Sequence, residues 1–315
     1  LAQVQAPYAD TMISGMSLDS RSTKAGDLFF ATQGLKAHGL EFSQHAIANG
    51  AAAIAWEPRN SVQQVDSPRA IPCIPIPALQ QQVGLIAKRF YGNPSKYINI
   101  IGVTGTDGKT SVSQFIAQAL NQLKISCGVI GTLGNGVYPD FKPTTYTTPN
   151  AICIQALLHS FFKKKIVNTV IEASSHGLKQ GRLNGVNVDT AVFTNLGHDH
   201  MDYHSSLKEY GNSKSILFKT PNLKNAVINI DDAFGRQLAN ELNKQINIVS
   251  YSCSNSKPSF DSYINAPNVS FTNKLTKIEV DSSWGKATIR TKLYGKFNVS
   301  NILATMAVLL VNGCS

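Results

Sequence analysis

Residues that could bind a nucleoside triphosphate are concentrated in the segment IGVTGTDGKTS, residues 101–111. Lys109 could neutralise phosphate charge, Thr110 could place its hydroxyl on Mg²⁺, and the glycines would let backbone N–H groups approach the phosphates. The usual template, G-x-x-x-x-G-K-[ST], would require glycine at position 103, which is Val103, and the glycines of this segment lie on either side of it. The segment therefore predicts a phosphate-binding loop of a variant kind.

Two further segments carry polar side chains directly after strand-like runs. Glu172 ends the run NTVIE, at the edge of a sheet where open α/β folds bind ligands, and it could hold Mg²⁺. Taken alone, such a glutamate is more often a solvent-facing residue at a strand end. The run HDHMDYH, residues 198–204, has a composition typical of metal sites, although its spacing fits no zinc template. Lys214 is spaced by four residues from Tyr210 and Phe218, which favours an ordinary structural lysine on a helix.

Alternating apolar runs and helical stretches predict the scaffold that positions these residues. The run 97–105 is typical of a strand buried on both faces, and residues 109–124 place Val112, Ile116 and Leu123 at helical spacing. This order of elements predicts a mostly parallel, doubly wound sheet, and residues 277–295 alternate like a late antiparallel hairpin. Further strand-like runs occur at 127–134, 168–175, 190–197, 225–231 and 246–252.

The first part of the chain predicts a separate small α/β unit. GDLFFAT at 26–32 is strand-like, and residues 45–57 indicate a helix followed by a strand. Residues 68–95 indicate a short strand and an amphipathic helix that ends near a Gly-Asn-Pro-Ser turn. We therefore expect an N-terminal substrate-binding domain at 1–95 and a central ATP-binding domain at 96–315.

Composition and charge narrow the class of protein. The 315 residues are 43% hydrophobic and 15% charged, as in ordinary globular proteins. The net charge of +10 suits nucleic acid or a polyanionic small molecule, but its residues are spread out, and the dense run at 163–165 indicates a solvated helix end. Five scattered cysteines and the lack of a long apolar run predict a cytoplasmic protein without disulfides. Because the chain starts without Met and stops after an apolar stretch, we expect a fragment of a longer protein.

The chain resembles the Mur ligase family in five segments, which occur in the family's order: TGTDGKT, EASSHGLKQGR, VFTNLGHDHMDYH, YGNSKSILF and GKFNVSN. The loop variant T-G-T-[N/D]-G-K-T is the family's own, which accounts for the displaced glycines. LDSR at 18–21 and GDLFFA at 26–31 resemble the MurE type, which acts on UDP-N-acetylmuramoyl-L-alanyl-D-glutamate. The resemblance covers nearly the whole chain.

The resemblance implies an ATP-dependent ligase of peptidoglycan precursor synthesis. ATP would phosphorylate the γ-carboxylate of the D-glutamate, and the amine of a third amino acid would then attack the acyl phosphate. We expect meso-2,6-diaminopimelate as that amino acid, with L-lysine as the alternative. The resemblance further implies a cytoplasmic monomer that binds small molecules and neither nucleic acid nor membrane. It also implies a C-terminal Rossmann-like domain, which this chain lacks.

The resemblance also assigns roles to individual residues. Those expected at ATP are Gly105, Thr106, Asp107, Gly108, Lys109, Thr110 and Ser111, with Asn298 and Asn301 at the adenine. Catalytic roles fall to Lys109, Glu172, His200 and Lys214, and two Mg²⁺ ions would be held by Thr110, Glu172, His200 and carbamoylated Lys214. The uridine nucleotide would contact Leu18, Ser20, Leu35, Lys36 and Ala37. The muramoyl dipeptide would contact Thr147, Thr148, Ser174, Gln180 and Arg182.

The chain departs from the family's pattern at three positions. Asp107 stands where Asn is commoner, and its side chain could cap the following helix. Tyr146 stands where some relatives carry an Asn that contacts the dipeptide. His198 replaces a frequent Arg and receives no role.

Four alternatives remain at this point. Two are related enzymes: a ligase that adds a dipeptide, and a folate-linked glutamate ligase, against which LDSR and GDLFFAT argue. The third is a nucleotide-binding regulatory module, which would not need all of the catalytic residues that are present. The fourth is a nucleic-acid binder, which only the basic charge supports.

Overall fold

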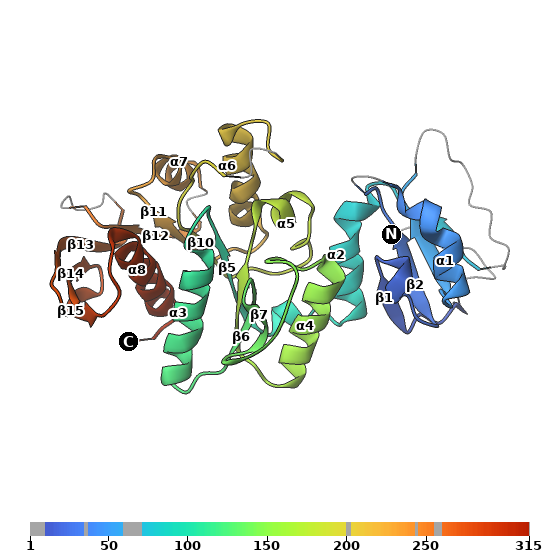
Figure 1. Ribbon diagram of the computed structural model, residues 1–315, viewed down its shortest axis with the longest axis horizontal. Coiled ribbons are helices and arrows are strands. Elements are labelled where there is room, and N and C mark those ends of the chain that lie inside the picture. The colour runs from blue at the N-terminus through green and yellow to red at the C-terminus, as the bar shows by residue number, and fades with distance from the viewer. Residues whose placement is uncertain are drawn as a thin grey trace.

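The computed structural model describes residues 10–34, 37–58, 71–199, 203–242, 245–254 and 260–314. Its strands form two sheets, a small one near the N-terminus and a large one in the rest of the chain (Figure 1). The small sheet is parallel throughout and has the order β1-β2-β3-β4. Its strands are β1 (Gly15–Ser17), β2 (Asp27–Ala31), β3 (Ala53–Trp56) and β4 (Cys73–Pro75). The strands expected at 26–32, 45–57 and 68–95 are therefore confirmed.

Helices cover both faces of the small sheet. On one face, α1 (Ser43–Ala48) packs Ile47 against Phe29 and Ile54. On the other face, Phe30 and Ala55 pack against α2 (Leu79–Phe90). The same cluster includes Ala151 and Ile152 of α4 (Ala151–Lys163), so α2 lies between the small sheet and the large domain (Figure 1). Among the described residues of this part, short 3₁₀ turns lie at Ser20–Ser22 and Gly39–Phe42.

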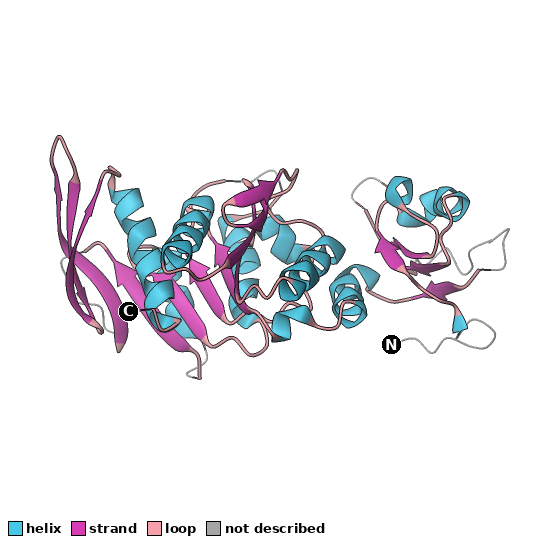
Figure 2. Cartoon of the chain, turned by 90° about the horizontal axis from the view of Figure 1, so that it is seen from below, coloured by secondary structure: helices cyan, strands magenta, loops and turns pink. Residues whose placement is uncertain are grey.

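Within the described part of the chain, the large sheet has eleven strands in the order β15-β14-β13-β12-β11-β10-β5-β9-β6-β7-β8. The seven strands from β13 to β6 are parallel, and an antiparallel hairpin extends each edge. The parallel strands are β5 (Asn99–Thr104), β6 (Cys127–Gly131), β9 (Asn168–Glu172), β10 (Thr190–Phe193), β11 (Asn225–Asn229), β12 (Asn247–Ser252) and β13 (Ser262–Phe271). The edge strands are β7 (Gly134–Val137), β8 (Asp140–Lys142), β14 (Thr276–Ser282) and β15 (Gly285–Thr291). This arrangement confirms the mostly parallel sheet and the late hairpin, whose strands lie at one end of the molecule in Figure 2.

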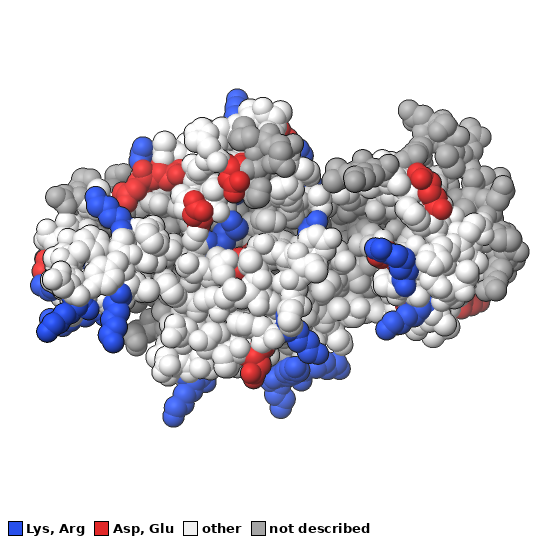
Figure 3. Space-filling model, viewed as in Figure 1, with Lys and Arg blue, Asp and Glu red and all other residues white. Residues whose placement is uncertain are grey.

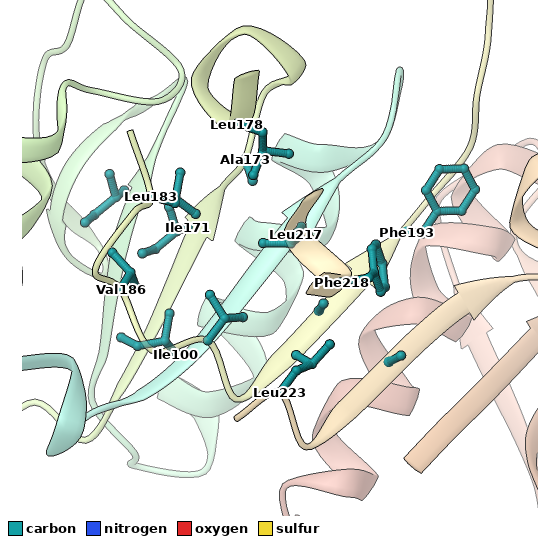
Figure 4. Packing of buried hydrophobic residues seen from close by; sticks show 14 of the residues in the cluster. Ile100, Ile171, Ala173, Leu178, Leu183, Val186, Phe193, Leu217, Phe218 and Leu223 are labelled. Atoms are coloured by element: carbon teal, nitrogen blue, oxygen red, sulfur yellow. The ribbon is translucent and has the colours of Figure 1, made fainter. Parts of the chain in front are cut away.

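Neighbouring residues of β5 point to opposite faces of the large sheet, and each face has its own core. Ile101 packs with Ile116 of α3 (Lys109–Gln122) and Leu303 of α8 (Lys296–Val311). Ile100 belongs to the opposite core, which includes Leu217 and is drawn in Figure 4. Helices on both faces make the sheet doubly wound, as expected. The opposite face carries α4, α5 (Ser175–Lys179), α6 (Leu207–Ser215), the 3₁₀ turn Ile216–Lys219 and α7 (Ala233–Glu241).

The surface of the large domain bears on the expectations for Leu123 and for the lysine run at 163–165. Leu123, expected on the buried face of its helix, is 48% exposed because α3 ends at Gln122 and Leu123 lies beyond its last turn. The lysine run begins at Lys163, the last residue of α4, and is exposed, which confirms a solvated helix end. Lys and Arg side chains are scattered over the face drawn in Figure 3 and form no single large patch there. Within the described ranges, no helix is long and apolar enough to cross a membrane.

Candidate active site

The phosphate-type loop connects β5 to α3, and its two glycines have conformations that other residues rarely adopt. Gly105 has a φ of +151° and Gly108 a φ of +83°. A Cβ on Gly105 would overlap the hydroxyl of Thr194, and one on Gly108 would lie 2.5 Å from Asn301 Oδ1. Backbone conformation and close neighbours therefore both require glycine at these two positions. The loop ends at the positive N-terminus of α3, which is suited to bind anions.

Lys109 is folded over the loop. Its Nζ donates hydrogen bonds to the carbonyl oxygens of Gly105 (2.9 Å) and Thr106 (2.7 Å). Burial lowers the pKa of Lys109, and the nearby carboxylate of Glu172 opposes that shift. The ammonium group is thus held at the loop by carbonyl oxygens that a phosphate oxygen could replace.

Glu172 lies at the carboxyl end of β9 and is completely buried, so the solvent-facing interpretation of this residue is wrong. Its Oε2 accepts hydrogen bonds from the hydroxyls of Thr110 (2.8 Å) and Thr132 (2.9 Å). Its Oε1 accepts one from the backbone N–H of Thr132, at 3.0 Å. A buried carboxylate beside two hydroxyls offers only hard oxygen donors, so this set fits Mg²⁺.

Lys214 on α6 is only 1% exposed, which overturns the interpretation of an ordinary helix lysine. Its Nζ donates to the carbonyl oxygen of Gly105 at 2.7 Å, the same oxygen that accepts from Lys109. The ammonium also lies 4.0 Å from the ring centroid of Tyr210. Burial, together with the positive charge of Lys109, lowers the pKa of Lys214 to about 7.

The histidine- and aspartate-rich run at 198–204 is described only in part. His200, a predicted metal ligand, lies outside the described residues together with Asp202. His204 is buried, and its Nε2 lies 3.1 Å from Ser175 Oγ. The centroid of its ring lies 5.0 Å from that of the Tyr210 ring. Among the described residues, no three His, Cys, Asp or Glu side chains form a group that could hold a metal. His204 thus belongs to an aromatic cluster, and the role of His200 stays a prediction.

The residues expected to bind the dipeptide gather beside Glu172. The hydroxyl of Thr148 donates to the carbonyl oxygen of Glu172 at 2.7 Å and accepts from the N–H of Ser174 at 3.0 Å. The hydroxyl oxygen of Thr147 lies 3.1 Å from that of Thr132. Arg182 donates through Nε and Nη2 to the side-chain oxygen of Gln180. Burial lowers the pKa of Arg182.

A groove of about 650 Å³ runs from these residues to the first part of the chain. Leu18, Thr32 and Gly34 are shared with a second cavity, of about 630 Å³, which lies in that first part. Gln180 and Arg182 line the other end of the groove. The two hollows therefore form one continuous path across the two sheets.

The cavity in the first part contains the described residues that were expected to meet the uridine nucleotide. Leu18, Ser20 and Ala37 line it, whereas Leu35 and Lys36 lie outside the described residues. Ser20 Oγ lies 3.1 Å from His45 Nδ1, and Asn49 donates to the carbonyl oxygen of Ser20 at 2.8 Å. Ser20 is thereby fixed on the cavity wall.

A third hollow, of about 490 Å³, lies beside the phosphate-type loop and was not found by sequence reasoning. Its lining includes Asn195, which exchanges hydrogen bonds with the backbone of Asp107. Asn298 and Asn301 do not line it, although Asn301 lies next to Gly108. The signal in the sequence was the position of Asn195, Asp231, Cys253 and Ser254 just after strands of the parallel sheet. The complete lining is Asn195, Asn229, Asp231, Cys253, Ser254, Lys296, Phe297 and Ser300.

The side chain of Asp107 does not cap α3. The residue at the cap position is Gly108, and no side chain makes a capping hydrogen bond there. Asp107 is exposed, and only its backbone is tied to the neighbouring loop. The expected capping role is therefore wrong, because the left-handed glycine begins the helix one residue later.

Comparisons with known proteins identify the family of the chain. Residues 103–309 match the Mur ligase middle domain, and residues 12–91 match the Mur ligase family, catalytic domain. The chain belongs to the Mur ligase family, as the five segments predicted.

Among curated relatives, the chain is 40% identical to UDP-N-acetylmuramoyl-L-alanyl-D-glutamate--2,6-diaminopimelate ligase of Coxiella burnetii over 308 residues. That match covers 98% of this chain and 63% of the relative. The ligase of the same name from Pseudomonas aeruginosa is 40% identical, with 96% and 60% covered. The chain therefore spans about three fifths of the length of these relatives.

Solved structures give the same result. A 2,6-diaminopimelate ligase structure superimposes with a TM-score of 0.86 at 33% identity, over 99% of this chain and 62% of that one. MurF ligase from Thermotoga maritima, solved with ADP, has a TM-score of 0.65 at 21% identity, over 97% of this chain and 64% of that one. The second match supports the fold alone.

Proposed function

We propose that this chain forms the nucleotide-substrate and ATP-binding parts of a ligase that adds meso-2,6-diaminopimelate to UDP-N-acetylmuramoyl-L-alanyl-D-glutamate. The observation that carries the proposal is the groove that adjoins the cavity at Ser20 and reaches Arg182. Arg182 donates to the carbonyl oxygen of Thr148, whose hydroxyl in turn donates to the carbonyl oxygen of Glu172. A long substrate with a uridine nucleotide at one end and a reacting carboxylate at the other fits such a path. The diaminopimelate ligases among the relatives support the choice of amino acid.

ATP would bind at the loop between β5 and α3. Backbone N–H groups of residues 105–111 and the positive end of α3 would hold the phosphates, and Lys109 would exchange its carbonyl partners for phosphate oxygens. The nucleoside would occupy the hollow beside Asn195, with Asn298 and Asn301 on α8. At the opposite end, Arg182 would recognise a carboxylate of the dipeptide with its planar fork.

Mg²⁺ bound at this site would offset the negative charge that accumulates during phosphoryl transfer. Thr110 and Glu172 would hold one ion, and His200 is proposed as a further ligand. Lys214 is proposed to be carbamoylated, by addition of CO₂ to its amine with loss of a proton, which would turn a cation into a carboxylate for a second ion. The family resemblance and the buried position of Lys214 beside Gly105 support this assignment.

The reaction would then proceed in two steps. An oxygen of the γ-carboxylate attacks the terminal phosphorus of ATP, and ADP leaves. The amine of diaminopimelate attacks the resulting acyl phosphate, an amide bond forms, and phosphate leaves. Lys109 and the loop would stabilise the transferring group, and Arg182 with Thr148 and Ser174 would orient the acceptor. These substrates and the scattered cysteines support a cytoplasmic location, and the family resemblance supports a monomer.

The proposal is tested by ATP-dependent phosphate release and by calorimetric titration with each substrate. Release that requires the muramoyl dipeptide and diaminopimelate would support it, whereas release with L-lysine would change only the amino acid. Release only with a muramoyl tripeptide and a dipeptide would indicate the dipeptide-adding type. Binding of ATP without binding of any muramoyl nucleotide would favour a regulatory module.

A further inference from the structure

Tyr146 is an exposed aromatic residue in the wall of the groove. Its side chain is 61% exposed, although most aromatic rings of this size are placed where they bury apolar surface. Its backbone is fixed by a local turn, since its N–H donates to Thr144 Oγ1 at 3.4 Å and its carbonyl accepts from the same hydroxyl at 3.2 Å. The ring is therefore presented to the groove by an ordered segment.

One side of the Tyr146 ring is supported by Arg182. The guanidinium carbon lies 5.4 Å from the ring centroid, within the range of a cation–π contact. Arg182 is itself held by Gln180, at 3.0 and 2.7 Å, and by the carbonyl oxygen of Thr148. The ring thus rests on an anchored cation, and the remainder of its surface is open.

Tyr146 lines the groove that leads from the nucleotide cavity to the residues expected to hold the dipeptide, and it lies beside Arg182. Leu18, Thr32 and Gly34 mark where the groove joins the cavity of the first part. Gln180 and Arg182 mark the end near Glu172. In the proposed substrate, the group between the nucleotide and the dipeptide is the amino sugar.

A pyranose ring presents a face of C–H groups that complements the negative face of an aromatic ring. We propose that Tyr146 is a stacking platform for the N-acetylmuramoyl ring and so contributes to the selection of amino-sugar nucleotides. This inference rests on the proposed function.

The test is a series of three ligands titrated calorimetrically into the chain: UDP, UDP-N-acetylmuramate, and UDP-N-acetylmuramoyl-L-alanyl-D-glutamate. Tyr146→Ala is expected to weaken binding of both sugar-containing ligands by about three- to tenfold, as for a lost aromatic face contact, and to leave UDP unchanged. Tyr146→Phe keeps the ring and is expected to bind all three ligands like the wild type. Tyr97→Ala is the matched control, because Tyr97 is similarly exposed (58%) and does not line the groove.

Three results would overturn the inference. If Tyr146→Ala binds the sugar nucleotides as tightly as the wild type, the ring makes no contact with the sugar. If Tyr146→Phe loses as much affinity as Tyr146→Ala, the contact is made by the hydroxyl and not by the ring. If Tyr146→Ala loses affinity only for UDP-N-acetylmuramoyl-L-alanyl-D-glutamate, the substitution acts through Arg182 and the dipeptide, not through the sugar. If the wild type binds UDP but neither sugar-containing ligand, the proposed function itself fails, and this result is visible before any variant is compared.

Discussion

At the scale of single residues, the site depends on one buried carboxylate. Glu172 has no exposed surface, and both of its oxygens accept hydrogen bonds. Glu172→Gln has nearly the same shape but removes the negative charge. Its amide NH₂ would also face Thr110 and Thr132, which themselves donate hydrogen bonds to this position. We expect Mg²⁺-dependent ATP binding to be lost and phosphate release to fall by about 10²- to 10³-fold, as when a transition-state contact is removed.

The measurement for Glu172→Gln is ATP titration over a range of Mg²⁺ concentrations, together with denaturant unfolding. Glu241→Gln serves as the control, because Glu241 is exposed at the end of α7. The same Mg²⁺ dependence in wild type and Glu172→Gln would show that this carboxylate does not hold the ion.

The limits of sequence reasoning are clearest at this scale. Lys109 and Thr110 could be predicted because the residues of a phosphate loop are contiguous and have a fixed spacing. Lys214 could not, because helical spacing shows which residues share a face but not which element covers that face. Its burial depends on Gly105, more than 100 residues earlier in the chain. The hollow beside Asn195 was missed for the same reason, since its residues come from the ends of separate strands.

At the scale of elements, the sheet was predictable wherever a strand is a continuous apolar run between turns. The hairpin of β7 and β8 was not, because GNGV and DFK are short and show no clear alternation. α6 was predicted as a helix, but its contact with the phosphate-type loop is a tertiary feature. The hydroxyl of Tyr210 on α6 accepts a hydrogen bond from Thr106 Oγ1 at 3.2 Å.

The contact between α6 and the loop predicts the effect of Tyr210→Phe. The ring beneath Lys214 is kept, and the acceptor for Thr106 is removed. We expect the KM for ATP to rise about fivefold, as for the loss of roughly 1 kcal/mol from one hydrogen bond, with little change in kcat. The measurement is steady-state kinetics with varied ATP. Tyr294→Phe is the control, because the hydroxyl of Tyr294 donates to the carbonyl oxygen of Thr272 and not to the loop. A fall in kcat with an unchanged KM would argue against a loop-positioning role.

The connection from β5 to α3 predicts a steric effect at Gly105. Gly105→Ala adds a methyl group that would overlap the Thr194 hydroxyl, in addition to the backbone strain. Gly92→Ala has the strain without the overlap, since nothing lies within 4 Å of its Cβ position. We expect Gly92→Ala to cost about 1 kcal/mol of unfolding free energy and Gly105→Ala about 2–4 kcal/mol, measured by denaturant titration. Equal losses would show that the loop relaxes around the methyl group.

At the scale of the whole molecule, the groove exists only while the two sheets keep their relative position. α2 packs on the small sheet on one side and on α4 on the other, and it brings Gly84 against the turn that carries Asn184. The turn follows Gln180 and Arg182, which line the groove. The fit of α2 against this turn therefore sets the width of the groove between the nucleotide cavity and Arg182.

Gly84→Ala tests this arrangement, because its Cβ would overlap the carbonyl oxygen of Asn184 and push α2 away from the turn. The cavity at Ser20 and the loop at Lys109 each lie within one part of the chain, so affinities for UDP and for ATP should not change. Affinity for the muramoyl dipeptide nucleotide, which has to span both parts, should fall about tenfold, equivalent to roughly 1.4 kcal/mol. Calorimetric titration of the three ligands measures this pattern, with Leu85→Ala on the exposed side of α2 as the control. Equal losses of affinity for all three ligands would indicate general unfolding. Unchanged affinity for the muramoyl dipeptide nucleotide would mean that the groove does not depend on how α2 packs against the turn at Asn184.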